Sequence, residues 1–154
     1  MNEYQKIKLI VYDFDGVMTD NKVYVNEEGN EMVQVNRADG LGVSEIKKRG
    51  IGQIIISTEK NPVVSIRADK LNIECLQAID DKEIALTNYC EKRGIDFEHV
   101  AYVGNDINDI DAMKIVGFKF CPSDSHESIK KISDHVFKTS GGNGVIRELL
   151  ELIN

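Results

Sequence analysis

The chain has 154 residues, of which 42% are hydrophobic, so it is long enough to bury a core and lies within the usual size range of one domain. Its formal net charge of -7 and its pI near 5.0 argue against a nucleic-acid-binding surface, which needs clustered Lys and Arg. No apolar run approaches the ~20 residues that span a bilayer, and no basic segment with a long apolar run opens the sequence. We therefore expect one soluble, cytoplasmic domain over residues 1–154 that binds neither nucleic acid nor membrane.

Short apolar runs rich in β-branched residues alternate with helical patterns along the chain. The predicted buried strands are Ile7–Phe14, Gln53–Ser57, Cys75–Gln77, Val100–Val103 and Phe118–Cys121. The predicted helices are Leu41–Arg49, Val63–Leu71, Lys82–Lys92, Asn108–Val116, Glu127–Ile132 and Val145–Ile153. Such alternation predicts an α/β fold with a doubly wound parallel sheet, in which functional residues follow the carboxyl ends of the strands.

One segment, about residues 22–36, breaks the alternation. Two strand-like runs, Lys22–Asn26 and Glu31–Asn36, flank four turn-forming residues and predict a protruding β-hairpin. A free hairpin is only marginally stable, and this one is rich in Val. We therefore expect it to pack against another surface, such as a subunit interface, and we expect no large cap domain.

The cysteines and histidines indicate no separate chemistry. The three cysteines are odd in number and set among apolar neighbours, which favours reduced core thiols over disulfides or a zinc site: Cys75, Cys90 and Cys121. The three histidines are predicted to be structural: His99, His126 and His135.

Asp13 and Asp15 close the first predicted strand. Because side chains alternate faces along a strand, both carboxylates point the same way, and Phe14 points back into the core. Two such carboxylates repel each other unless a cation lies between them, and a hard divalent ion, Mg²⁺ first, is the natural partner. The spacing of a calcium-binding EF-hand is absent. The alternative is a turn with two solvated carboxylates.

Two further segments carry polar groups, one at a strand end and one at a helix start. Ser57, with Thr58 behind it, could donate to a phosphoryl oxygen, but a Ser-Thr pair before Pro62 is more often a helix cap. Lys82 lies at a predicted helix start, where a cation is unfavourable unless an anion is close. It could neutralise a phosphoryl group, or pair on the surface with neighbouring acidic residues such as Asp81.

The fourth strand ends in the loop Gly104–Asp109, which places four oxygen-bearing side chains within one turn. Asn105, Asp106, Asn108 and Asp109 suit a second metal-facing loop. The alternative is a polar turn that caps the following helix.

These segments, taken in order, resemble the haloacid dehalogenase superfamily of phosphohydrolases. Its four motifs correspond to Asp13-x-Asp15, Ser57, Lys82 and Gly104-Asn105-Asp106-x-x-Asp109. The resemblance implies a Mg²⁺-dependent phosphatase that works through an aspartyl-phosphate intermediate. Asp13 is then the nucleophile, Asp15 the general acid and base, and Lys82 a catalytic cation.

The resemblance also implies the other roles at the site. Ser57, Thr58 and Lys82 would bind phosphate. Asp106 and Asp109 would position the residues that contact the metal and the phosphate, without contacting them directly. The metal ligands would be Asp13, Asp15 and Asn105. Many relatives have Asp where this chain has Asn105, a neutral ligand that should bind Mg²⁺ more weakly. That departure leaves open a non-catalytic tetramerisation module.

The hairpin and the glycine-rich segment 141–147 are similar to those of the capless tetrameric branch of the superfamily. That branch holds 3-deoxy-octulosonate 8-phosphate phosphatases, nonulosonate 9-phosphate phosphatases and C-terminal domains of cytidylyl-sialate synthetases. The resemblance implies a homotetramer with active sites at subunit interfaces and a sugar phosphate as substrate. Thr58-Glu59-Lys60 and Arg67 resemble the nine-carbon branch more, with Glu59 and Lys60 on the sugar and Arg67 on the sugar carboxylate in an adjacent subunit. The octulosonate phosphatase is the alternative; Glu59, Lys60 and Arg67 could also be exposed helix residues.

Overall fold

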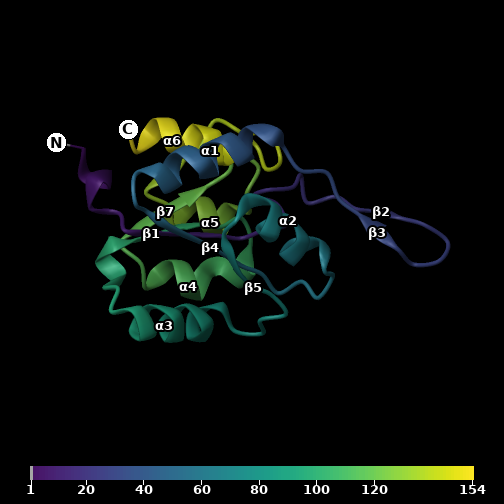
Figure 1. Cartoon of the computed structure of the whole chain (residues 1–154), viewed down its shortest axis with the longest axis horizontal. Coiled ribbons are helices and arrows are strands. Elements are labelled where there is room, and N and C mark those ends of the chain that lie inside the picture. The colour runs from purple at the N-terminus through teal and green to yellow at the C-terminus, as the bar shows by residue number, and fades with distance from the viewer. Residues whose placement is uncertain (1) are drawn as a thin grey trace.

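A six-stranded, fully parallel sheet forms the centre of the computed structural model, which describes residues 2–154 (Figure 1). In chain order the strands are β1 (Leu9–Tyr12), β4 (Gly52–Ile56), β5 (Glu74–Leu76), β6 (Val100–Val103), β7 (Phe118–Cys121) and β8 (His135–Val136). Their spatial order is β5-β4-β1-β6-β7-β8. The chain therefore reverses its direction of winding beside β1, and the three strands β4, β1 and β6 lie together at the middle.

Helices cover both faces of the sheet, as the layers in Figure 1 show. One face carries α1 (Arg37–Lys48), α2 (Val63–Leu71) and α6 (Val145–Leu152). The other carries α3 (Lys82–Arg93), α4 (Ile110–Lys114) and α5 (Glu127–Ile132). Residues 2–154 also form three short 3-10 helices: η1 (Glu3–Lys6), η2 (Phe97–His99) and η3 (Ile107–Asp109).

Alternation along the central strands divides the core into two clusters. In β1, Ile10 and Tyr12 pack toward α1 and α6, and Leu9 and Val11 pack toward α3 and α4. All four side chains are buried, as expected for a parallel strand with both faces covered. The prediction of a doubly wound parallel α/β fold is confirmed.

Several element boundaries differ from those predicted. Helix α1 begins at Arg37 rather than Leu41, because the Asn36 side chain caps it by accepting from the backbone N–H of Ala38 at 2.8 Å. The predicted helix 108–116 is a 3-10 turn followed by the short α4. Strand β8 was not predicted, because its two residues lie in a polar segment.

The predicted hairpin is present as β2 (Tyr24–Val25) and β3 (Glu31–Met32), which pair antiparallel and extend away from the body (Figure 1). Its apolar side chains are exposed, with Tyr24 72% and Met32 63% accessible. Nearer the body, Val33 and Val35 pack partly against the core. The exposed strands therefore offer an apolar surface that this chain alone does not cover.

Two further features concern the whole chain. Among residues 2–154, no helix combines the length and the apolar character needed to cross a membrane. Cys75, Cys90 and Cys121 are all free thiols, as predicted; Cys90 and Cys121 are buried, and Cys75 is partly exposed.

Candidate active site

The polar side chains that follow β1, β4 and β6 meet at one edge of the sheet. Parallel pairing aligns Tyr12 with Ile55 and with Val103, so β1 and β6 end level and β4 ends one residue farther along. The backbone N–H of Asp13 donates to the carbonyl of Val103 at 3.0 Å, which holds Asp13 one residue beyond β1. Ser57 takes the same position after β4. The sheet thus gathers residues that lie far apart in the sequence.

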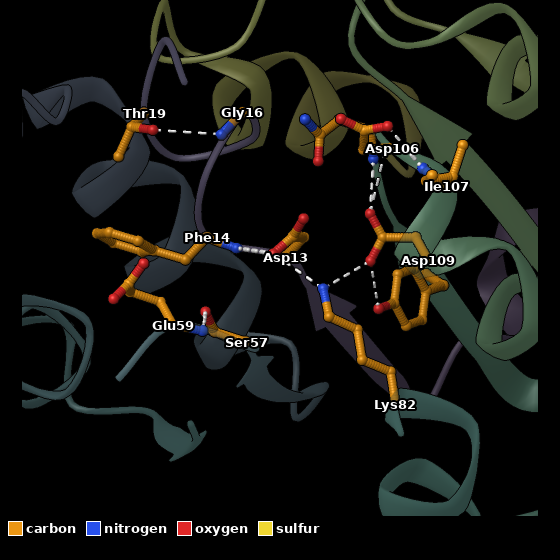
Figure 2. Close-up of polar contacts among 12 residues, drawn as sticks. Asp13, Phe14, Gly16, Thr19, Ser57, Glu59, Lys82, Asp106, Ile107 and Asp109 are labelled. Atoms are coloured by element: carbon orange, nitrogen blue, oxygen red, sulfur yellow. Dashed lines mark hydrogen bonds and ion pairs between the residues drawn. The ribbon is translucent and has the colours of Figure 1, made fainter. Parts of the chain in front are cut away.

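The Asp13 carboxylate is buried at the floor of this site, with 6% of the residue exposed. Its Oδ1 accepts from the backbone N–H of Phe14 at 2.7 Å and lies 3.1 Å from Nζ of Lys82 (Figure 2). Burial raises the pKa of Asp13, the nearby Asp109 raises it further, and the Lys82 ammonium opposes both. Lys82 is therefore the group that favours the charged carboxylate.

Lys82 is the first residue of α3, and its ammonium lies between two carboxylates. Nζ donates to Oδ1 of Asp109 at 2.8 Å, and the side chain is only 1% exposed. Burial lowers its pKa, but Asp13 and Asp109 together raise it above the ordinary value. Asp81 instead caps α3 by accepting from the N–H of Ile84 at 3.0 Å. The ion pairs of Lys82 are thus internal, which goes against the surface-pairing alternative.

Asp109 is fully buried and supports both Lys82 and the loop after β6. Its Oδ1 also accepts from the Tyr102 hydroxyl at 2.8 Å, and its Oδ2 accepts from the backbone N–H groups of Asn105 at 2.9 Å and Asp106 at 3.3 Å. Tyr102 lies within β6. Its position in an apolar run predicts a core residue, so the sequence did not indicate its contact with Asp109. Asp109 therefore ties the cation to the loop that carries Asn105.

Three oxygen atoms converge beside Asp13. The side-chain oxygen of Asn105 faces only acceptors, namely Oδ2 of Asp13 at 2.8 Å and the backbone carbonyl of Asp15 at 3.0 Å. Rotating the amide by half a turn would make both contacts hydrogen bonds, and a hard cation between the oxygens would satisfy them equally. The residues therefore fit a divalent metal ligated by one carboxylate, one carbonyl and one amide.

A cavity of about 340 Å³ opens over these oxygens. Its lining residues come from the three segments that follow β1, β4 and β6: Asp13, Asp15, Asn21, Thr58, Asn105, Asp106, Ile107 and Asn108. Asp15 is half-buried, and burial raises its pKa, with Glu59 adding to the effect. Asp13 and Asp15 thus share a pocket, as the strand alternation predicts. Asn21 and Ile107 were missed by the sequence reasoning, because nothing in their local pattern ties them to the motif residues.

Ser57 and Glu59 form a turn beside the cavity (Figure 2). The buried Ser57 hydroxyl accepts from the Glu59 backbone N–H at 3.1 Å. The Glu59 carboxylate accepts from the backbone N–H groups of Lys60 and Asn61 at 2.9 Å each. Ser57 does not cap α2, whose cap residue is Pro62. The helix-cap alternative for Ser57 is therefore wrong.

The comparisons with known proteins agree with this geometry. Residues 2–149 match the family model of haloacid dehalogenase-like hydrolases. The chain belongs to this family. The 3-deoxy-D-manno-octulosonate 8-phosphate phosphatase KdsC of Escherichia coli is 34% identical over 154 residues, which are 99% of this chain and 82% of that protein. The corresponding enzyme of Salmonella typhi is also 34% identical over the same extent.

Solved structures of this hydrolase family show the same fold. The octulosonate phosphatase of Moraxella catarrhalis, in complex with magnesium, phosphate and KDO, is 37% identical with a TM-score of 0.93, covering 98% of this chain and 89% of that chain. A cobalt-bound octulosonate phosphatase of Haemophilus influenzae is 29% identical, with a TM-score of 0.93 and the same coverage. The predictions of the superfamily and of a phosphatase are confirmed.

None of the three predicted substrate residues lines the hydrolase cavity; Glu59 belongs to the turn described above. The Lys60 side chain is exposed and does not line the cavity. Arg67 lies on α2, where its Nη2 donates to the Asn36 carbonyl at 3.2 Å and its side chain lines a separate cavity of about 490 Å³ with Arg37 and Lys70. Within one chain, Arg67 does not reach Asp13. Its predicted role in a neighbouring subunit stays a prediction.

Asp106 and the histidines have structural contacts in this member of the family. Asp106 accepts from the Ile107 backbone N–H at 2.7 Å and forms a capping box with Asp109 (Figure 2). The structure shows Asp106 as a capping residue, and its predicted support of a metal site stays a prediction. His126 caps α5, and neither it nor the other two histidines line the cavity: His99 and His135.

Proposed function

We propose that this chain is a Mg²⁺-dependent phosphatase that removes phosphate from a 2-keto-3-deoxy sugar acid, with 3-deoxy-D-manno-octulosonate 8-phosphate as its preferred substrate. The observation that carries the proposal is the buried Asp13 carboxylate, which lies against Lys82 on one side and the oxygens of Asp15 and Asn105 on the other. The names of the relatives support the octulosonate over the nonulosonate.

In this proposal the two oxygens of Asp13 have different roles. Oδ2 lies among the oxygens that would hold the metal, which leaves Oδ1 to attack phosphorus. As the Oδ1–phosphorus bond forms, the bond to the sugar oxygen breaks and Asp15 gives that oxygen a proton. Asp15 then takes a proton from water, whose oxygen attacks phosphorus and releases Asp13 and phosphate.

Positive charge at the site favours this transfer. The Lys82 ammonium lies 3.1 Å from the attacking oxygen and offsets charge that builds on the phosphoryl group. Ser57 and Thr58 would donate hydroxyl protons to phosphoryl oxygens. A bound Mg²⁺, held by Asp13, Asp15 and Asn105, supplies further compensation of the phosphoryl charge.

A cytoplasmic homotetramer is part of the proposal. The exposed apolar side chains of β2 and β3 need a partner surface, and a second copy of the chain supplies one. In the assembly, a neighbouring subunit would cover the sugar bound over Asp13. Arg67 and the uncovered cations beside it would then face that neighbour's site.

A nonulosonate 9-phosphate is the second candidate substrate. It is favoured by Thr58-Glu59-Lys60 and by Arg67, whose fork suits a carboxylate. The test is phosphate release with Mg²⁺ from the octulosonate 8-phosphate and from 9-phosphorylated nonulosonates, compared by kcat/KM. A higher kcat/KM for the octulosonate supports the proposal. A reversed order would assign the chain to the nine-carbon branch, and no release from either would favour the tetramerisation module.

A further inference from the structure

Asn21 has an unusual backbone at the mouth of the cavity. Only three non-glycine residues in the described part of the chain have positive φ, and they are Asn21 at 67°, Asn72 at 56° and Ala78 at 56°. Asn72 ends α2, which is an ordinary place for this conformation. Asn21 ends no helix. Among non-glycine residues Asn adopts this conformation most readily, and here the contacts of its neighbours hold it in place.

The surroundings of Asn21 connect it to the catalytic loop. The buried Thr19 hydroxyl accepts from the backbone N–H of Gly16 at 3.2 Å and from that of Asn21 at 3.1 Å (Figure 2 shows the first of these). The Asp20 carboxylate accepts from the N–H of Lys22 at 2.9 Å. One hydroxyl thus fixes Asn21 relative to the turn that follows Asp15.

Asn21 lines the same cavity as Asp13 and Asp15. Asn21 is exposed, and its side-chain amide makes no hydrogen bond within residues 2–154. An amide offers both a donor and an acceptor, which matches a sugar hydroxyl better than it matches a phosphoryl dianion. Asn108 is the other exposed amide in the lining, and what distinguishes Asn21 is the Thr19 hydroxyl that fixes its backbone beside the turn after Asp15.

We propose that Asn21 is a specificity-determining residue that hydrogen-bonds a hydroxyl group of the leaving sugar. This inference rests on the proposed function. The phosphoryl group lies over Asp13, so the leaving group extends outward through the cavity mouth, where Asn21 is held. The contact selects polyhydroxylated phosphomonoesters over phosphomonoesters without hydroxyl groups.

The experiment compares two substrates with the full chain and Mg²⁺. One is the octulosonate 8-phosphate, and the other is para-nitrophenyl phosphate, whose leaving group has no aliphatic hydroxyl. The variant Asn21→Gly removes the amide and keeps the left-handed backbone without strain. Asn72→Gly is the matched control, because it makes the same change at the end of α2, away from the cavity.

We expect the ratio of the two kcat/KM values, sugar over aryl, to fall about three- to tenfold in Asn21→Gly, which corresponds to one hydrogen bond. The loss should lie mainly in KM for the sugar, and Asn72→Gly should keep the wild-type ratio. An unchanged ratio in Asn21→Gly, with wild-type enzyme active on both substrates, would overturn the inference alone. No release by the wild type would overturn the proposed function and this inference with it.

Discussion

Lys82 and Asp109 form a buried ion pair, 2.8 Å from Nζ to Oδ1, that holds the ammonium against Asp13. Because burial weakens screening, a partner left alone here is costly. The pair therefore links the chemistry of the site to the stability of the fold.

Lys82→Met should lower both the catalytic rate and the stability of the fold. Asp13 and Asp109 would stay buried without a cation, which we expect to cost about 3–5 kcal/mol of unfolding free energy. The phosphoryl charge would also lose its compensation, so kcat should fall at least about 100-fold. Denaturant unfolding and phosphate release measure the two effects. Lys92→Met, an exposed position on the same helix, is the control, and equal effects in both variants would refute this account.

Asn105→Asp should strengthen metal binding. Its side-chain oxygen faces Asp13 and the Asp15 carbonyl, so a carboxylate there adds a charged ligand to the metal. We expect Mg²⁺ to bind about tenfold more tightly, measured by calorimetric titration, and the metal-free variant to be less stable than wild type. Asn108→Asp adds the same charge at the exposed wall of the same cavity. Equal tightening in both variants would show that net charge alone is responsible.

Gly141→Ala should disturb the catalytic loop. A Cβ at Gly141 would overlap the carbonyl oxygen of Gly16, so the backbone must shift. We expect a loss of about 1–3 kcal/mol in stability and a lower kcat, as for other overpacked sites. Gly40→Ala is the control, since its Cβ would approach Leu71 no closer than 3.6 Å. Thermal unfolding and kcat that match wild type in Gly141→Ala would contradict the close approach of Gly141 to Gly16.

Asp39 should make stability depend on pH. It is buried in α1, its Oδ1 accepts from the Ile146 backbone N–H at 3.1 Å, and its Oδ2 has no partner among residues 2–154. Burial raises the pKa of Asp39 from 3.8 to about 6, although the Ile146 N–H and Arg67 lower it in part. The folded state therefore holds this proton more tightly than the unfolded state. Its stabilising contribution is complete below about pH 4 and is lost as the pH rises through 6.

The variant Asp39→Asn isolates this effect, because the amide keeps an acceptor for Ile146 and cannot ionise. Relative to wild type, its unfolding free energy should rise by up to about 3 kcal/mol between pH 4 and pH 7. Urea unfolding at both pH values measures the difference. Asp111→Asn, an exposed position, serves as the control. A difference that does not change with pH would contradict the raised pKa of Asp39.

The sequence was sufficient to predict where the motif residues that follow strands lie in the fold. Apolar runs predicted β1, β4 and β6, and the rule that parallel strands end at one edge then brought Asp13, Ser57 and Asn105 together. The prediction of a nine-carbon substrate rested on Glu59, Lys60 and Arg67. The relatives instead favour the octulosonate, which was the alternative. In this chain the Glu59 carboxylate is bound to its own turn.

Contacts between distant segments could not be predicted from local pattern. Tyr102 reads as one more apolar strand residue, and only the folded structure places its hydroxyl on Asp109. The same holds for Thr19, whose hydroxyl joins Gly16 to Asn21. The predicted start of helix α1 was too late, because Gly40 within the helix resembles a turn residue.

The most direct test of the central claim is Mg²⁺-dependent phosphate release from 3-deoxy-D-manno-octulosonate 8-phosphate by wild type and by Asp13→Asn. The variant keeps the shape of the side chain and removes the nucleophile. We predict release by wild type that stops when the metal is chelated, and no release by the variant. Equal release by both proteins would contradict an aspartyl-phosphate mechanism at Asp13.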